Sequence, residues 1–174
     1  MFDLGDGTVA KVFRRVKQTH RPVRDWSDHE FLVRQLFATE RRAYEQLQSS
    51  LDLCKYTPRY LGQLDIANLG ISSSNGGEPL LSDCALRLER IDGRDTKIAL
   101  VQPPLQEQIE AVLERIRDTV GQINVWDCSC FIPGPQTPFT VIDFALWEQW
   151  ADVQVYLEQN DSIPAAVREQ VRVR

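Results

Sequence analysis

The sequence predicts an α+β domain. Short segments rich in β-branched and aromatic residues alternate with longer segments whose apolar residues recur every three or four positions. Their order is strands, helix, strands, helix, strands and helices, which favours α+β over a regular strand-helix-strand repeat. A chain of 174 residues suits one compact core. We expect a single domain over residues 1–174, with a sheet-plus-helix part at 1–91 and a reduced helical part at 92–174.

The first predicted element is a hairpin over residues 2–13. A turn is expected at the Gly-Asp-Gly of residues 5–7, followed by the strand-like sequence TVAKVF. Because side chains alternate along a strand, Val9, Lys11 and Phe13 should share one face. The basic stretch 14–26 has no period and is expected to be a loop.

The first helix should run from Ser27 to about Ser49. Ser27 and Glu30 fit a capping box. An apolar stripe follows at three- and four-residue steps: Leu32, Leu36, Ala43, Tyr44 and Leu47. Glu40 lies on the same stripe, where a carboxylate is costly unless it meets a cation or hydrogen-bond donors.

The rest of the chain predicts further elements of both kinds. A turn entering a strand is expected at 57–64, strands at 84–91 and 139–144, and a strand or extended segment at 122–126. A loop is expected at 68–83, and helices at 105–120, 146–157 and from 162 onward.

Composition narrows the class of protein. The net charge is −5 and the pI about 5.1, which gives no general attraction for nucleic acid. No apolar run approaches the ~20 residues of a membrane span, and the N-terminus lacks the pattern of a secretory signal. We expect a cytoplasmic protein without a membrane or nucleic-acid partner.

The four cysteines include no Cys-x-x-Cys pair, so reduced thiols are favoured over zinc or disulfides. The oligomeric state is left open, with a homodimer as one alternative.

Four charged residues stand where a simple core would not place them: Lys11, Glu40, Asp127 and Asp143. Each has an ordinary explanation, since a lysine can snorkel to the surface and acids commonly end strands or helix stripes. Together they predict one shared polar site. Only four of the 20 basic residues are lysines, so a compact ammonium at Lys11 is a specific chemical choice.

The succession of motifs resembles the protein-kinase-like superfamily, including the aminoglycoside-phosphotransferase-like kinases. Residues 7–13 (GTVAKVF) resemble the strand that carries the family's lysine, and residues 39–47 (TERRAYEQL) the helix that carries its glutamate. Residues 57–62 (TPRYLG) are similar to the following strand, and residues 88–93 (LERIDG) to the hinge. Asp127 falls where the catalytic-loop aspartate would, and residues 141–145 (VIDFA) look like the metal-binding Asp-Phe-Gly segment.

The resemblance implies a role for each candidate residue, with ATP and Mg²⁺ as cofactors. Lys11, held by Glu40, would face the phosphates of a nucleotide, and Asp143 would coordinate Mg²⁺. Asp127 would accept a hydroxyl proton. The backbone from Glu89 to Ile91 would hydrogen-bond an adenine edge.

The sequence also departs from the family pattern. A glycine-rich loop is reduced to the turn at 5–7. Where the catalytic-loop asparagine would follow Asp127, the chain has Ile132, or Cys130 if the loop is two residues shorter. The stretch after Ala145 is too short for the usual acceptor-binding part. We therefore expect a degenerate kinase-like protein that binds or acts on a small molecule and transfers phosphoryl groups poorly. The alternatives are an ATP- and Mg²⁺-dependent phosphotransferase, and a scaffold or oligomerising module anchored by tryptophans: Trp26, Trp147 and Trp150.

Overall fold

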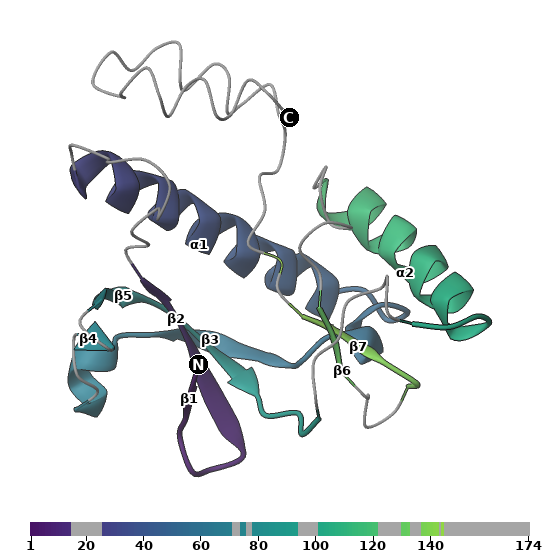
Figure 1. The fold of residues 1–174 in the computed structure, drawn as a ribbon, viewed down its shortest axis with the longest axis horizontal. Coiled ribbons are helices and arrows are strands. Elements are labelled where there is room, and N and C mark those ends of the chain that lie inside the picture. Colours follow the sequence, from purple (N-terminus) through teal and green to yellow (C-terminus); the bar gives the residue numbers. More distant parts are fainter. Residues whose placement is uncertain are drawn as a thin grey trace.

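A computed structural model describes residues 1–14, 26–70, 74–75, 78–93, 101–121, 130–132, 137–142 and 144. Its main feature is an antiparallel sheet with strand order β1-β2-β5-β3, with β4 pairing to β5 off this path (Figure 1). The strands are β1 (Phe2–Asp3), β2 (Thr8–Arg14), β3 (Tyr60–Leu64), β4 (Ser74–Asn75) and β5 (Glu78–Glu89). The predicted α+β class is confirmed.

β1 and β2 form the predicted N-terminal hairpin, with Phe2 opposite Ala10. Gly5 and Gly7 have φ of 78° and 80°, a left-handed conformation that glycine adopts at no steric cost. The Asp3 carboxylate accepts a hydrogen bond from Gly5 N–H at 2.9 Å, which ties the turn to the strand before it.

β5 is longer than expected, so the predicted loop at 68–83 is wrong for residues 78–83, and it is also wrong at β4. The Ser-, Asn- and Gly-rich run 72–77 and Pro79 had suggested the loop. In the structure Pro79 pairs only with Ser74 of the two-residue β4, and the pairing of β5 with β2 begins at Leu80. The missing N–H therefore removes no bond from the main sheet. The strand ends at Glu89, two residues before the predicted end.

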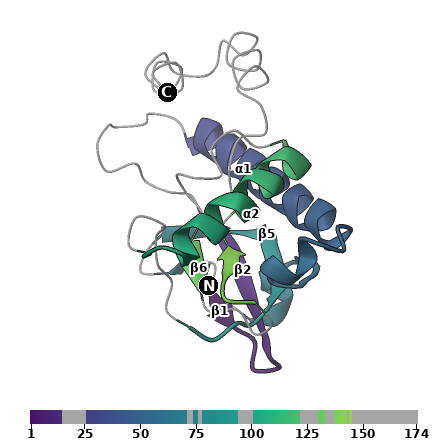
Figure 2. The same cartoon turned by 90° about the vertical axis from the view of Figure 1, so that its right-hand side faces the viewer.

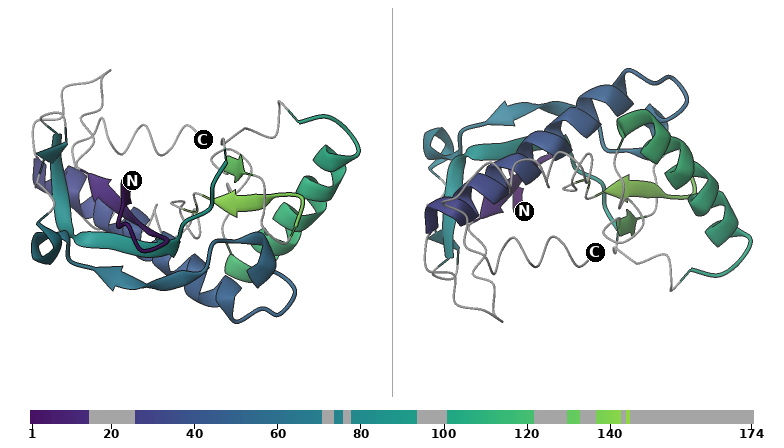
Figure 3. Two further views of the ribbon diagram at one scale, coloured as in Figure 1. Left: turned by 90° about the horizontal axis from the view of Figure 1, so that it is seen from below. Right: turned by 90° about the horizontal axis from the view of Figure 1, so that it is seen from above.

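The helix α1 (Trp26–Gln48) crosses one face of the sheet (Figures 1 and 3). It begins one residue before Ser27, so the predicted N-cap residue lies inside the first turn. The residues of α1 buried against the sheet and α2 include Val33, Phe37, Ala43, Tyr44 and Leu47.

The second helix, α2 (Leu105–Val120), was predicted with the right bounds and apolar face. Its buried residues are Ile109, Val112, Leu113, Ile116 and Val120. Gly121, with φ of 68°, closes it by donating to the carbonyl of Arg117 at 2.8 Å. The strands β6 (Cys130–Ile132) and β7 (Thr140–Ile142) form an antiparallel hairpin, and with α2 they lie near the C-terminal half of α1 (Figures 1 and 2).

Alternation along β5 divides the core between the two faces of the sheet. Leu86 and Leu88 join the large cluster formed with α1, α2 and β7. Ala85 points to the other face, where it packs with Ile66 of the short 3₁₀ helix η2 (Ile66–Leu69). On β2, Phe13 and Val9 belong to the α1 side, as the predicted alternation requires.

Several predicted elements lie outside the described residues: the strand at 122–126 and the helices at 146–157 and from 162 onward. Among the residues described, no helix is long and apolar enough to cross a membrane. Cys54 and Cys84 carry free thiols.

Candidate functional site

The structure brings Lys11 and Glu40 together, although they lie 29 residues apart in the sequence. The Lys11 ammonium on β2 donates to Oε1 of Glu40 on α1 at 2.7 Å. The Glu40 side chain is fully buried, while the Lys11 side chain is 21% exposed. The pair therefore joins a glutamate closed to solvent to a lysine whose side chain is partly open to it.

The surroundings of the pair are aromatic. Lys11 Nζ lies 5.6 Å from the centre of the Phe13 ring, two residues further along the same face of β2. That ring meets Phe37, one turn before Glu40, edge to face at 5.4 Å. In such a low-dielectric setting an ion pair is much stronger than in water, and a lone buried charge is much more costly.

Glu40 has a second donor, the backbone N–H of Phe144, at 3.3 Å from Oε1. The Phe144 ring is buried and contacts Tyr44, one turn after Glu40, edge to face at 5.2 Å. Residues 104 positions apart therefore converge on one carboxylate. Asp143 is the neighbour of Phe144 in the sequence, but Asp143 and Asp127 themselves lie outside the described residues.

The segment 89–91 continues from the end of β5. The Glu89 N–H donates to the carbonyl of Arg59 at 2.8 Å, and the Arg90 N–H donates to that of Gly7 at 3.0 Å. Both donors are thus committed to the sheet. Within the described residues the Ile91 N–H has no such bond, so it is the donor of this segment that a ligand could use.

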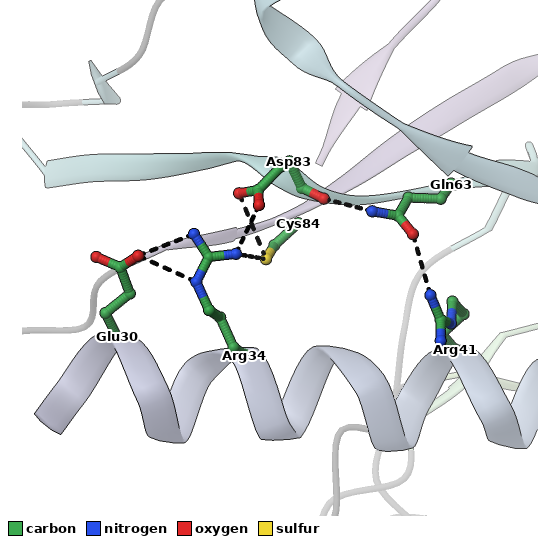
Figure 4. A network of polar contacts seen from close by, with 6 residues as sticks. All are labelled: Glu30, Arg34, Arg41, Gln63, Asp83 and Cys84. Carbon is green, nitrogen blue, oxygen red and sulfur yellow. Dashed lines mark hydrogen bonds and ion pairs between the residues drawn. The ribbon is translucent and has the colours of Figure 1, made fainter. Parts of the chain in front are cut away.

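A separate polar network fastens the N-terminal half of α1 to the sheet (Figure 4). Arg34 of α1 pairs with Glu30 one turn earlier at 2.8 Å and with Asp83 of β5 at 2.6 Å. It also donates to the Cys84 sulfur at 3.2 Å. Nearer Glu40, Arg41 donates to Gln63, whose amide donates in turn to the Asp83 carbonyl. These bonds hold α1 at one position on the sheet, which is the position that aligns Glu40 with Lys11.

The pKa values in this network follow from its contacts. The hydrogen bond from Arg34 holds the pKa of Asp83 below its ordinary value. Bonds to Asp83 and Glu30 raise the pKa of Arg34. Burial raises the pKa of the Cys84 thiol to about 11. Because the thiolate is the reactive form, Cys84 is an inert structural cysteine rather than a nucleophile.

The described residues contain no group of three or more His, Cys, Asp or Glu side chains that could hold a metal ion. What they provide at Lys11 is a positive charge fixed in direction by a buried carboxylate. Such an ammonium can donate hydrogen bonds to a phosphate or carboxylate of a ligand, without the planar constraint of a guanidinium.

Two parts of this arrangement were not predicted from the sequence. The Phe144 N–H is a backbone donor, and a backbone donor leaves no mark in the sequence. Arg34 and Asp83 lie 49 residues apart in the sequence. Both are charged residues with partly exposed side chains, which is common for charged residues. Only the Glu30–Arg34 pair has a local signal, its spacing of four residues on a helix.

The fold and the site together define an α+β protein in which a buried lysine–glutamate pair joins an antiparallel sheet to the helix that crosses it. Comparisons with protein-family models, with curated proteins and with solved structures found no match.

Proposed function

We propose that this protein is a reduced kinase-like protein that binds a small phosphorylated molecule, a nucleotide in the first instance, at Lys11. Its capacity for phosphoryl transfer is weak or lost. The observation that carries the proposal is the Lys11–Glu40 pair, 2.7 Å long, with a fully buried Glu40 side chain and a partly exposed Lys11 side chain.

A buried ion pair needs a reason other than stability. Removing two charges from water costs several kcal/mol per ion, and a well-packed apolar pair commonly stabilises a core as well or better. Local violations of simple core design are expected at functional sites. A strand lysine held by a helix glutamate is the arrangement with which protein kinases place a cation at nucleotide phosphates.

The order of the described elements supports the same proposal. A lysine-bearing strand, a glutamate-bearing helix, three further strands, the segment 89–91 and a helix follow one another in an order compatible with the resemblance. The chain returns to Glu40 at Phe144, directly after Asp143. This return is what the resemblance requires if Asp143 is to act beside Lys11.

Each residue then has a defined task. Lys11 donates to phosphate oxygens, and Glu40 directs the ammonium toward them. Phe144 N–H holds Glu40 in place, and Ile91 N–H donates to the edge of the base. We assign metal binding to Asp143 and the acceptance of a hydroxyl proton to Asp127. Mg²⁺ bound with the nucleotide would neutralise phosphate charge.

The test is thermal unfolding with increasing ATP and ADP, with and without Mg²⁺. A ligand that binds the folded state raises the melting temperature by mass action, and we expect a shift at millimolar nucleotide. Lys11→Arg should fold, since it keeps a cation beside Glu40, and should lose most of the shift. Arg117→Gln, a change at a half-buried position of α2, is the control and should keep the shift.

The outcome separates the proposed function from its alternatives. Absence of a shift with the wild-type chain, or an equal shift with Lys11→Arg, contradicts the proposal and favours a scaffold. If ADP and phosphorylated product accumulate during incubation with Mg²⁺ and candidate acceptors, the chain is an active phosphotransferase, and the assigned loss of transfer is wrong.

A further inference from the structure

A cavity of about 300 Å³ lies apart from the Lys11–Glu40 pair, neither of whose residues lines it. Its walls come from the end of α1, the short 3₁₀ helix η1 (Cys54–Tyr56), the approach to β3, the end of β5, and β7. The lining residues that matter here are Lys55, Arg59, Glu89 and Thr140. The volume is at the lower end of the range for small-molecule sites, so an occupant would be compact.

The Thr140 hydroxyl is the first indication that the cavity binds a ligand. The residue is 1% exposed and lines the cavity, yet its hydroxyl has no hydrogen-bond partner in the described part of the protein. A buried polar group without a partner is unfavourable and is rare in folded proteins. The hydroxyl oxygen has less than 1 Å² exposed, so a ligand oxygen would supply the missing bond after a small shift of the side chains that cover it.

The charged side chains around the cavity are the second indication that it binds a ligand. Lys55 and Arg59 contribute two cations, and neither side chain has an ion pair within the described residues. The Lys55 ammonium lies 5.3 Å from the centre of the Tyr56 ring, a cation–π contact that orients it. Glu89 contributes one carboxylate, which accepts the backbone N–H of Arg59 at 3.3 Å. Two positive side chains against one negative leave the lining with a net positive charge.

We propose that this cavity binds a compact molecule that carries an oxyanion, either a carboxylate or a phosphate. Lys55 and Arg59 bind the anionic oxygens at the mouth, and the Thr140 hydroxyl bonds to an oxygen further in. The proposal does not rest on the proposed function, because it uses neither Lys11 nor Glu40. The two sites share only the segment 89–91, of which Glu89 and Ile91 line the cavity.

The test is an NMR titration of the ¹⁵N-labelled chain with inorganic phosphate and, separately, with acetate. We expect saturable shifts of the backbone amides at 54–57, 59 and 140, with half-saturation on the order of 1 mM. Saturation by phosphate alone assigns a phosphate ligand, saturation by acetate alone a carboxylate ligand, and saturation by both a site that accepts either oxyanion.

Substitutions of the lining residues test where the anion binds. Lys55→Gln and Arg59→Gln should each weaken it by roughly tenfold, because each removes a charged hydrogen bond. Thr140→Val keeps the shape, removes the hydroxyl and should weaken it by about threefold. Arg117→Gln lowers the net charge equally, lies outside the cavity and should bind as the wild type does.

Three results would overturn the proposal: shifts that do not saturate, equal affinities in Lys55→Gln and Arg117→Gln, or saturable shifts confined to residues around 11 and 40. The last result would leave the proposed function intact. Conversely, Lys11→Arg should keep phosphate binding at the cavity even where it loses the response to nucleotide, so the two proposals fail separately.

Discussion

The helix α1 is fastened to the sheet by charge at two places that differ mainly in burial. Lys11 and Glu40 meet at 2.7 Å with side chains 21% and 0% exposed. Arg34 and Asp83 meet at 2.6 Å with side chains 40% and 54% exposed. The two distances are almost equal, so distance does not distinguish these contacts. Burial does, because water and salt weaken the second pair and are largely excluded from the first.

The comparison assigns a different role to each end of the helix. The Arg34 network costs little to form and sets where α1 lies (Figure 4). The Glu40 pair costs desolvation, a cost that ligand binding at Lys11 would justify if the proposed function holds. The following experiments break one contact or the other, from the largest expected effect to the smallest.

Lys11→Met should lower the free energy of unfolding by about 3–5 kcal/mol, because it leaves the Glu40 carboxylate buried without its cation. Denaturant unfolding measures this loss, and added salt should change it little. The double variant Lys11→Met with Glu40→Leu should recover most of the stability. A single variant as stable as the wild type would show that the carboxylate is not sealed from water.

Arg34→Ala should cost about 1 kcal/mol, since its ion pairs are partly exposed to water and its stem loses some packing. The same unfolding experiment at low and high salt checks the assignment: the difference from wild type should shrink as salt rises. A loss as large and as salt-independent as that of Lys11→Met would remove the distinction between the two ends of α1.

Acid should weaken the Arg34–Asp83 contact. The pKa of Asp83 in the folded state lies below its ordinary value of 3.8, because Arg34 hydrogen-bonds its charged form. The resulting stabilisation is complete above that pH and is lost as the pH falls through the folded-state pKa. In Asp83→Asn the free energy of unfolding should fall less steeply than in the wild type as the pH drops below 3.8. The difference should stay under ~1 kcal/mol, because the carboxylate is exposed. An unchanged slope between wild type and variant would contradict this.

The smallest effect is expected at the Arg115–Asp52 pair, 3.2 Å long, with side chains 52% and 77% exposed. Arg115→Ala should change the free energy of unfolding by less than ~0.5 kcal/mol. Measured in the same denaturation assay, this variant gives the smallest loss of unfolding free energy, with which the other losses are compared. A cost equal to that of Arg34→Ala would mean that the network around Arg34 adds nothing to a single surface pair.

The sequence was informative wherever a residue contradicted its local pattern. Lys11 within an apolar strand and Glu40 on an apolar helix stripe stood out for that reason, and the structure places them in contact. α2 was predictable because its apolar period is unbroken between Pro104 and Gly121.

The sequence was misleading or silent where the deciding factor is a distant partner. Pro79 hid the start of β5. A proline is acceptable at this position because the pairing of β5 with β2 begins only at Leu80. The bond from Phe144 N–H to Glu40 and the contact of Arg34 with Asp83 depend on how the chain returns to α1. No local pattern encodes that return.

The most direct test of the central claim uses the small number of lysines in the chain. Lys11, Lys17, Lys55 and Lys97 are the only four, so selective ¹³C and ¹⁵N labelling of lysine gives a side-chain spectrum that single substitutions can assign completely. If Lys11 is the phosphate-facing cation, its side-chain signal should move in a saturable way as ADP is added, ahead of the other three. A saturated titration in which the Lys11 signal stays in place while another lysine responds would contradict that claim.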